Sequence, residues 1–164
     1  MKITDAFLGE HGVFYAQFEH FESCSDDDDL GCVKRRAAQL AAALEPHAHL
    51  ENELLFDTLE ARGGELTGLL SVMREEHLEI EAALHEIRDT GSLTRARVLL
   101  RDMIQAAREH FEKEELVAFP LAEARLTDEE LAELGQIWAQ RRGVRVQAEL
   151  HGTGRPVARS APAP

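Results

Sequence analysis

Four long segments of the sequence carry apolar residues at helical spacing, and this periodicity constrains the fold more than any other feature. In the first segment, Phe7, Phe14, Phe18 and Phe21 recur at steps of three, four or seven residues, which places them along one face of an α-helix. The predicted helices span residues 4–22, 33–63, 66–89 and 94–124. Because most of the connections are short, the pattern predicts an all-α protein built as an up-down-up-down antiparallel four-helix bundle.

The region after the fourth segment predicts an extra C-terminal helix and a tail. Thr127 and Glu130 have the spacing of a capping box, which would open a helix that continues through Trp138. The last residues are rich in Pro, Ala and Gly and have no apolar period, which is typical of a disordered segment. The predicted units are a four-helix bundle over residues 1–125, a C-terminal helix packed on the bundle over 126–150, and a disordered tail over 151–164.

Two prolines and two cysteines mark local features of the chain. Pro46 lies inside the second predicted helix, where its missing N–H predicts a kink or restart, and Pro120 predicts a distortion just before it in the fourth. Cys24 and Cys32 flank an acidic loop. In a reducing compartment they are two free thiols, and their proximity leaves a redox-switched disulfide as the alternative.

Length and charge limit the classes of partner. A chain of 164 residues is long enough for one well-packed domain. The formal net charge of -13, with no basic stripe, argues against nucleic acids and anionic membranes as partners, since phosphate groups are bound by clustered Lys and Arg. The sequence shows neither a membrane-spanning apolar run nor a signal peptide. We therefore expect a cytoplasmic monomer or homodimer.

Polar residues interrupt the apolar faces of the predicted helices. In the second helix the inward row continues from Leu44 through His47 and Glu51 to Thr58, in steps of three and four residues. The neighbouring pair of His49 and Glu53 falls towards the other side, because His49 lies about 200° around the helix from His47. The sequence therefore predicts that His47 and Glu51 are buried and that His49 and Glu53 are at the surface.

The other three helices carry inward histidines as well. The inward row of the fourth helix includes His110 and Glu114 and continues to Val117. His77 and His11 take core positions in the third and first helices. Residues 51 and 77 are each about 13 residues, or roughly 20 Å, from the turn at 63–64. All these side chains should therefore meet within one to two helical turns along the bundle.

A cation would explain this inward polar set. A lone buried histidine is usually a hydrogen-bonded core residue, but burying two carboxylates without compensation would cost several kcal/mol each. Imidazole and carboxylate ligands without thiolates suit iron, manganese or zinc. The sequence thus predicts a dinuclear metal site with open coordination positions. Its predicted ligands are His11, His47, Glu51, His77, His110 and Glu114.

At these residues the sequence resembles the hemerythrin-like (HHE cation-binding) family. The stretches HAHLENELLF and HFEKEELVAF match its repeated His-x-x-x-Glu motif, and each has a Phe nine residues after its histidine, at Phe56 and Phe119. The resemblance covers about residues 1–125. It implies a non-haem centre of two iron ions, bridged by carboxylates and by oxo or hydroxo groups. The bound partner would be a small diatomic molecule or peroxide.

The sequence departs from the oxygen-carrying members that it resembles. Those members have two histidines four residues apart in the third helix, whereas the positions flanking His77 here hold Met73 and Glu81. Glu81 is an additional, weaker candidate ligand. The departure favours sensing, iron handling or protection from oxidative and nitrosative stress over reversible oxygen carriage.

Two further interpretations of function remain open. One is a di-iron enzyme that disproportionates peroxide or reduces NO. The sequence identifies no catalytic residue for such an enzyme, although Tyr15 is a candidate proton donor. The other is an interaction module in which a structural metal such as zinc braces the bundle.

Overall fold

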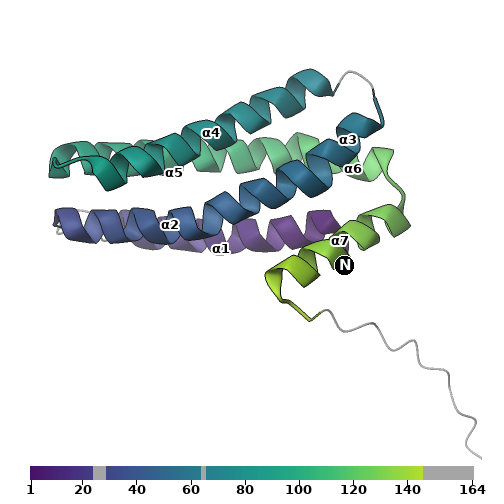
Figure 1. The fold of residues 1–164 in the computed structure, drawn as a ribbon, viewed down its shortest axis with the longest axis horizontal. Coiled ribbons are helices and arrows are strands. Elements are labelled where there is room, and N and C mark those ends of the chain that lie inside the picture. The colour runs from purple at the N-terminus through teal and green to yellow at the C-terminus, as the bar shows by residue number, and fades with distance from the viewer. Residues whose placement is uncertain (24–28, 64–65, 146–164) are drawn as a thin grey trace, which may run out of the picture.

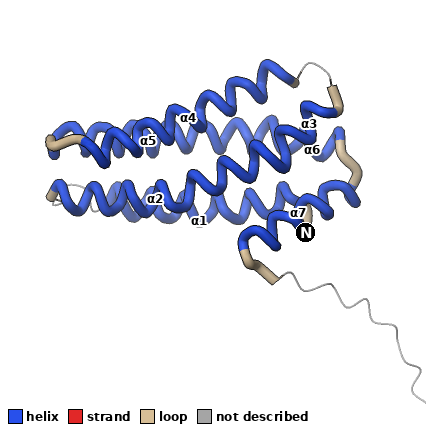
Figure 2. Tube along the Cα trace, in the orientation of Figure 1, coloured by secondary structure: helices blue, strands red, loops and turns tan. Residues whose placement is uncertain are grey.

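The computed structural model describes residues 1–23, 29–63 and 66–145, and their fold is the predicted all-α bundle with an extra helix (Figures 1 and 2). The bundle consists of four rods, two of which contain short π-helical segments. The helices are α1 (Ile3–Ser23), α2 (Leu30–Leu50), α3 (Asp57–Ala61), α4 (Thr67–Asp89), α5 (Leu93–Lys113), α6 (Phe119–Arg125) and α7 (Asp128–Arg142). The π-helical segments are η2 (Glu51–Phe56), which joins α2 to α3, and η3 (Glu114–Ala118), which joins α5 to α6.

Side chains at the helix ends account for several of the boundaries. Asp29 and Ser92 cap the N-termini of α2 and α5 by accepting hydrogen bonds from backbone N–H groups in the first turn. Thr127 and Glu130 form the predicted capping box at the start of α7. The helix α7 ends at Gly143, whose φ of 66° lies in the left-handed region, and glycine adopts this conformation without steric cost. Predictions for Cys24 and for residues 151–164 lie outside the described residues.

The irregularities in the long rods lie close to the prolines, but only one is where the sequence predicted it. The distortion before Pro120 is confirmed as η3. Of the kink or restart predicted at Pro46, the restart was wrong, because α2 remains α-helical through this residue and the π-helical segment begins at Glu51. A single missing N–H removes only one ladder hydrogen bond, and α2 tolerates this loss.

The two π-helical segments change which residues face the core. A residue nine positions after another would lie about 180° away in an unbroken α-helix, and a π-bulge adds one residue to a turn. Within η3 the buried row therefore shifts by one position: Val117, which was predicted to face inward, is 40% exposed, whereas Ala118 is buried. By the same shift Phe56 and Phe119 turn inward, and both are buried.

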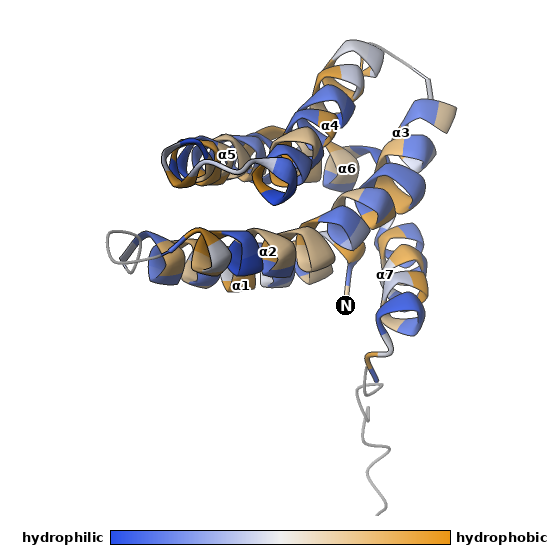
Figure 3. Cartoon of the chain, turned by 60° about the vertical axis from the view of Figure 1, so that its left-hand side comes forward, coloured by the Kyte–Doolittle hydropathy of each residue, from blue (hydrophilic) through white to orange (hydrophobic). Residues whose placement is uncertain are grey.

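Apolar side chains form two separate clusters along the bundle, whose helices each carry both hydrophobic and hydrophilic residues (Figure 3). The proximal cluster, at the end that carries α3, α6 and α7, includes Phe7, Leu55 and Phe119. The distal cluster, towards the opposite end, includes Phe18 and Met103. Among the described residues, no helix is both long and apolar enough to cross a membrane.

Candidate metal centre

The structure brings all six predicted ligand residues together in the interior. Both glutamates and three of the histidines are at most 1% exposed, and His77 is 8% exposed. The residues come from all four rods: α1 provides one histidine, α2 and η2 provide the first His-x-x-x-Glu pair, α4 provides the third histidine, and α5 and η3 provide the second pair. In each pair the glutamate is the first residue of a π-helical segment, a type of irregularity that is frequent at functional sites.

The six side chains form two potential metal-binding groups that share both glutamates. The first group consists of His11, His47, Glu51 and Glu114, and the second of Glu51, His77, His110 and Glu114. Within each group, the ligand atoms all lie within 4.8 Å of one another. Because each glutamate belongs to both groups, one carboxylate could contact two ions.

The distances between donor atoms are close to those expected around a metal ion. With metal–nitrogen bonds of about 2.1 Å, two nitrogen ligands of one ion lie about 3.0–3.4 Å apart. The Nε2 atoms of His11 and His47 are 3.2 Å apart, within this range, and those of His77 and His110 are 2.7 Å apart, slightly below it. Distances from these nitrogens to the oxygens of the glutamates run from 3.2 to 3.9 Å.

The carboxylates lack the hydrogen bonds that buried charges need. Neither oxygen of Glu51 and neither oxygen of Glu114 accepts a hydrogen bond from any described residue. Leaving such a group buried and unsatisfied is costly. A bound cation would satisfy all four oxygens, so the residues present fit a metal centre.

Three of the histidines are oriented by further glutamates through their outer ring nitrogens. The Nδ1 atom lies 2.9 Å from Glu115 in His11, 2.8 Å from Glu10 in His47, and 2.9 Å from Glu76 in His110. Metal-binding histidines are commonly held in this way, which fixes the tautomer and makes the ligand more basic. The exception is His77, whose buried Nδ1 has no hydrogen-bond partner among the described residues.

Each of these three outer glutamates is itself anchored. Glu115 accepts a hydrogen bond from the hydroxyl of Tyr15 at 3.1 Å, and Glu76 is paired with Lys113. Glu10 is held by α7, whose Trp138 Nε1 donates to it at 3.3 Å and whose Arg142 lies 2.8 Å away. The C-terminal helix thus supports the first group directly.

The electrostatics of the six residues favour positive charge between the carboxylates. Burial disfavours the imidazolium form of His11, but the carboxylates of Glu114 and Glu51 outweigh burial and raise its pKa to about 10. Burial also disfavours the imidazolium form of His110, but the carboxylate of Glu114 outweighs burial and raises the pKa of His110 to about 9. Burial also favours protonation of Glu51, yet the nearby histidines, first among them His47, hold its pKa well below the usual range.

Aromatic rings pack against the imidazoles and explain the phenylalanine spacing. Phe56 follows the first His-x-x-x-Glu pair and stacks on His77 of α4, with ring centroids 5.9 Å apart. Phe119 follows the second pair and stacks on His11 of α1, at 5.6 Å. Each motif therefore supplies a ring to a histidine of another helix. Phe111 also stacks on His11, at 4.0 Å.

The predictions for the surface pair of His49 and Glu53 and for the candidate ligand Glu81 have different outcomes. His49 and Glu53 form a surface ion pair, as predicted, with Nε2 and Oε1 3.1 Å apart and 67% of the His49 side chain exposed. Glu81 belongs to neither buried group and instead lies with Glu45 and His85 in a third group of potential ligands. Its role as an additional ligand of the buried centre therefore gains no support from the geometry.

The sequence analysis missed the three outer glutamates. Glu10 and Glu76 directly precede His11 and His77 in the chain, which is a weak signal. This adjacency in the chain is also misleading, because each of the two glutamates binds a histidine of a different helix and not its own neighbour. Glu115 follows Glu114 and has no distinguishing context of its own.

Comparison with known proteins supports the same interpretation. No curated protein and no solved structure gave a match. The family model described as "Hemerythrin HHE cation binding domain" matches residues 2–134, which include all six residues of the centre and most of the chain. The chain therefore belongs to the hemerythrin HHE cation-binding family.

Proposed function

We propose that the protein binds two iron ions in a non-haem centre and reacts with O2, peroxide or NO. In this proposal the histidines ligate terminally, two to each ion, while Glu51 and Glu114 bridge. The observation that carries the proposal is the sharing of both glutamates by the two groups. A mononuclear site would leave one pair of buried histidines without a cation.

The ligand set favours iron and leaves room for a small molecule. Nitrogen and oxygen donors without thiolate suit iron, with manganese and zinc as alternatives. Iron bound there would supply redox chemistry towards small oxygen or nitrogen species. Two histidines and two shared glutamates are four protein ligands for each ion, so an octahedral ion would keep open positions.

The cavity beside the centre also favours a small ligand. It has a volume of about 140 Å³ and is lined by three of the six residues, His47, His77 and His110. Sites for drug-sized ligands occupy about 300–1,000 Å³, so this cavity suits a diatomic molecule or peroxide. The single buried histidine on α4, His77, favours sensing, iron handling or stress protection over reversible oxygen carriage.

Absorption spectroscopy tests the proposal. The protein is loaded with ferrous iron without oxygen, desalted, and its spectrum recorded before and after air is admitted, with zinc-loaded protein as the redox-inactive control. We expect a new near-ultraviolet charge-transfer band in the iron protein alone. An iron-loaded protein whose spectrum is unchanged by air, peroxide and NO would contradict the proposal.

A further inference from the structure

The metal centre is closed along the bundle axis. It lies between the proximal and distal clusters, whose buried members include Phe7 and Phe119 on one side and Phe14 and Phe18 on the other. A hydrated divalent ion would have to cross one of these apolar layers to arrive from either end, and the cost of desolvating a charge makes that path unfavourable. An ion must therefore enter between two helices.

Three of the four seams between neighbouring rods are closed by histidine–carboxylate hydrogen bonds. Glu10 of α1 binds His47 across the seam with α2. Glu115 binds His11 across the seam between η3 and α1, and Glu76 of α4 binds His110 across the seam with α5. The larger groove beside α7 reaches Glu10, but none of the six central residues lines it.

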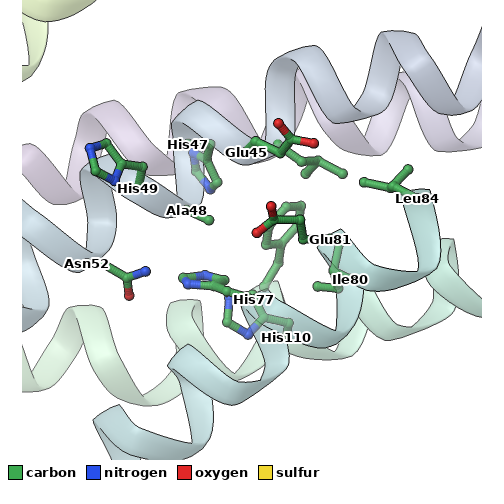
Figure 4. Close-up of a pocket in the computed structure, with 12 residues that line it drawn as sticks. Glu45, His47, Ala48, His49, Asn52, His77, Ile80, Glu81, Leu84 and His110 are labelled. Atoms are coloured by element: carbon green, nitrogen blue, oxygen red, sulfur yellow. The ribbon is translucent and has the colours of Figure 1, made fainter. Parts of the chain in front are cut away.

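The fourth seam, between α2 and α4, is different. The cavity of about 140 Å³ lies here and reaches His77, the most exposed residue of the six. Two buried polar atoms of cavity-lining residues, His77 Nδ1 and Asn52 Oδ1, have no hydrogen-bond partner among the described residues. In Figure 4 the Glu81 carboxylate lies between the two helices, with the rings of His77 and His110 next to each other.

Metal-ligating side chains also gather on the outer side of this seam. Glu45 of α2 and Glu81 and His85 of α4 offer ligand atoms that all lie within 4.8 Å of one another. The Glu45 and His85 side chains are 40% and 45% exposed, with Oε1 and Nε2 3.6 Å apart. Glu45 and Glu81 also line the cavity, so the group connects solvent with the buried histidines.

We propose that the α2–α4 seam is the entry route for the metal ions, and that Glu45, Glu81 and His85 form a receiving site for a divalent first-row cation at its mouth. Two carboxylates and one imidazole are suitable ligands for such a cation. A hydrated cation that exchanges some of its water molecules for these ligands loses its hydration in steps. The negative charge of the two carboxylates raises the local cation concentration. The unpartnered Nδ1 of His77 and the Asn52 amide line the path inward.

This inference rests on the proposed function only in requiring that the buried centre bind metal. Its test is the rate of cobalt(II) uptake by the full chain, followed in stopped flow by the visible absorption of the bound ion, together with the final cobalt content. The test variant carries Glu45→Gln and Glu81→Gln. The matched control carries Glu75→Gln and Glu79→Gln, which removes the same charge from exposed positions of α4 outside the cavity.

We expect the test variant to take up cobalt at least about tenfold more slowly than the control, the lower end of the effect of charged clefts on association rates. Its final cobalt content should be unchanged. Equal uptake rates in both variants would overturn the entry route, and a lower final content would overturn it in favour of Glu45 or Glu81 as permanent ligands. Failure of the unmodified protein to bind cobalt or iron would instead contradict the proposed function.

Discussion

The substitution Glu10→Gln should weaken metal binding at the first group through its effect on His47. Glu10 accepts the hydrogen bond from His47 Nδ1 at 2.8 Å, contacts Trp138 and Arg142, and has a side chain only 19% exposed. Glutamine keeps the shape but removes the negative charge that makes His47 a more basic ligand and that pairs with Arg142. Loss of such an outer carboxylate costs about 10- to 100-fold in metal affinity, or about 1.4–2.8 kcal/mol.

The chain offers a closely matched control in Glu53→Gln. Glu53 also binds a histidine of α2 and an arginine of α7, namely His49 and Arg141, but does so at the surface. Exposed ion pairs contribute about 0–1 kcal/mol, so this control should leave metal affinity unchanged. The assay is competition for zinc against a chromophoric chelator, with thermal melting of each metal-free variant. Equal zinc affinities for the two variants would refute the argument that Glu10 acts on the centre through His47.

Three further predictions concern the ligands and the packing of α7. His47→Ala should abolish binding of two ions whereas His49→Ala should leave the metal content near two, as measured by elemental analysis; equal losses would contradict the assigned roles. The pKa of His11 in the metal-free fold is about 10, above its unfolded value of 6.5, so its contribution to stability is complete below about pH 6.5 and is lost as the pH rises through 10. In thermal melting of the metal-free protein, the melting temperature should therefore fall as the pH rises towards 10, and this fall should be smaller in His11→Gln. An unchanged pH dependence in that variant would contradict the raised pKa of His11. Gly135→Ala should destabilise the protein by about 1–3 kcal/mol, because its Cβ would lie 2.4 Å from the backbone oxygen of Met1. A free energy of unfolding in denaturant within about 0.5 kcal/mol of that of the unmodified protein would show that α7 shifts freely.

The sequence predicts the bundle and the meeting of the six residues because both depend on regular helical periodicity. Steps of three and four residues place His47 with Glu51 and His110 with Glu114 on inward faces, and the structure buries all four. The prediction fails just after Glu114, where Val117 is exposed instead of buried, whereas Leu54 after Glu51 is buried as predicted. The spacing of the apolar residues does not show where the backbone hydrogen bonding changes from α to π. The spacing of nine residues from each histidine to its phenylalanine is the one sequence signal of the inserted residue.

The outer glutamates are beyond sequence reasoning for a different reason. Among 31 acidic residues, a glutamate on a partly exposed face is an ordinary solvated side chain. Whether Glu10, Glu76 or Glu115 reaches a histidine depends on the rotation of one helix against another, which periodicity does not determine. The group of Glu45, Glu81 and His85 is hidden in the sequence for the same reason, because it forms only where α2 faces α4.

The measurement that tests the account most directly is the number of iron ions retained per chain. Protein loaded with ferrous iron in the absence of oxygen is desalted, and iron and protein are determined on the same sample. The two groups that share Glu51 and Glu114 predict a value close to two, falling to one or less in Glu114→Ala. A value of one in the unmodified protein would contradict the dinuclear centre, and a value near zero would mean that the buried histidines and glutamates do not hold iron.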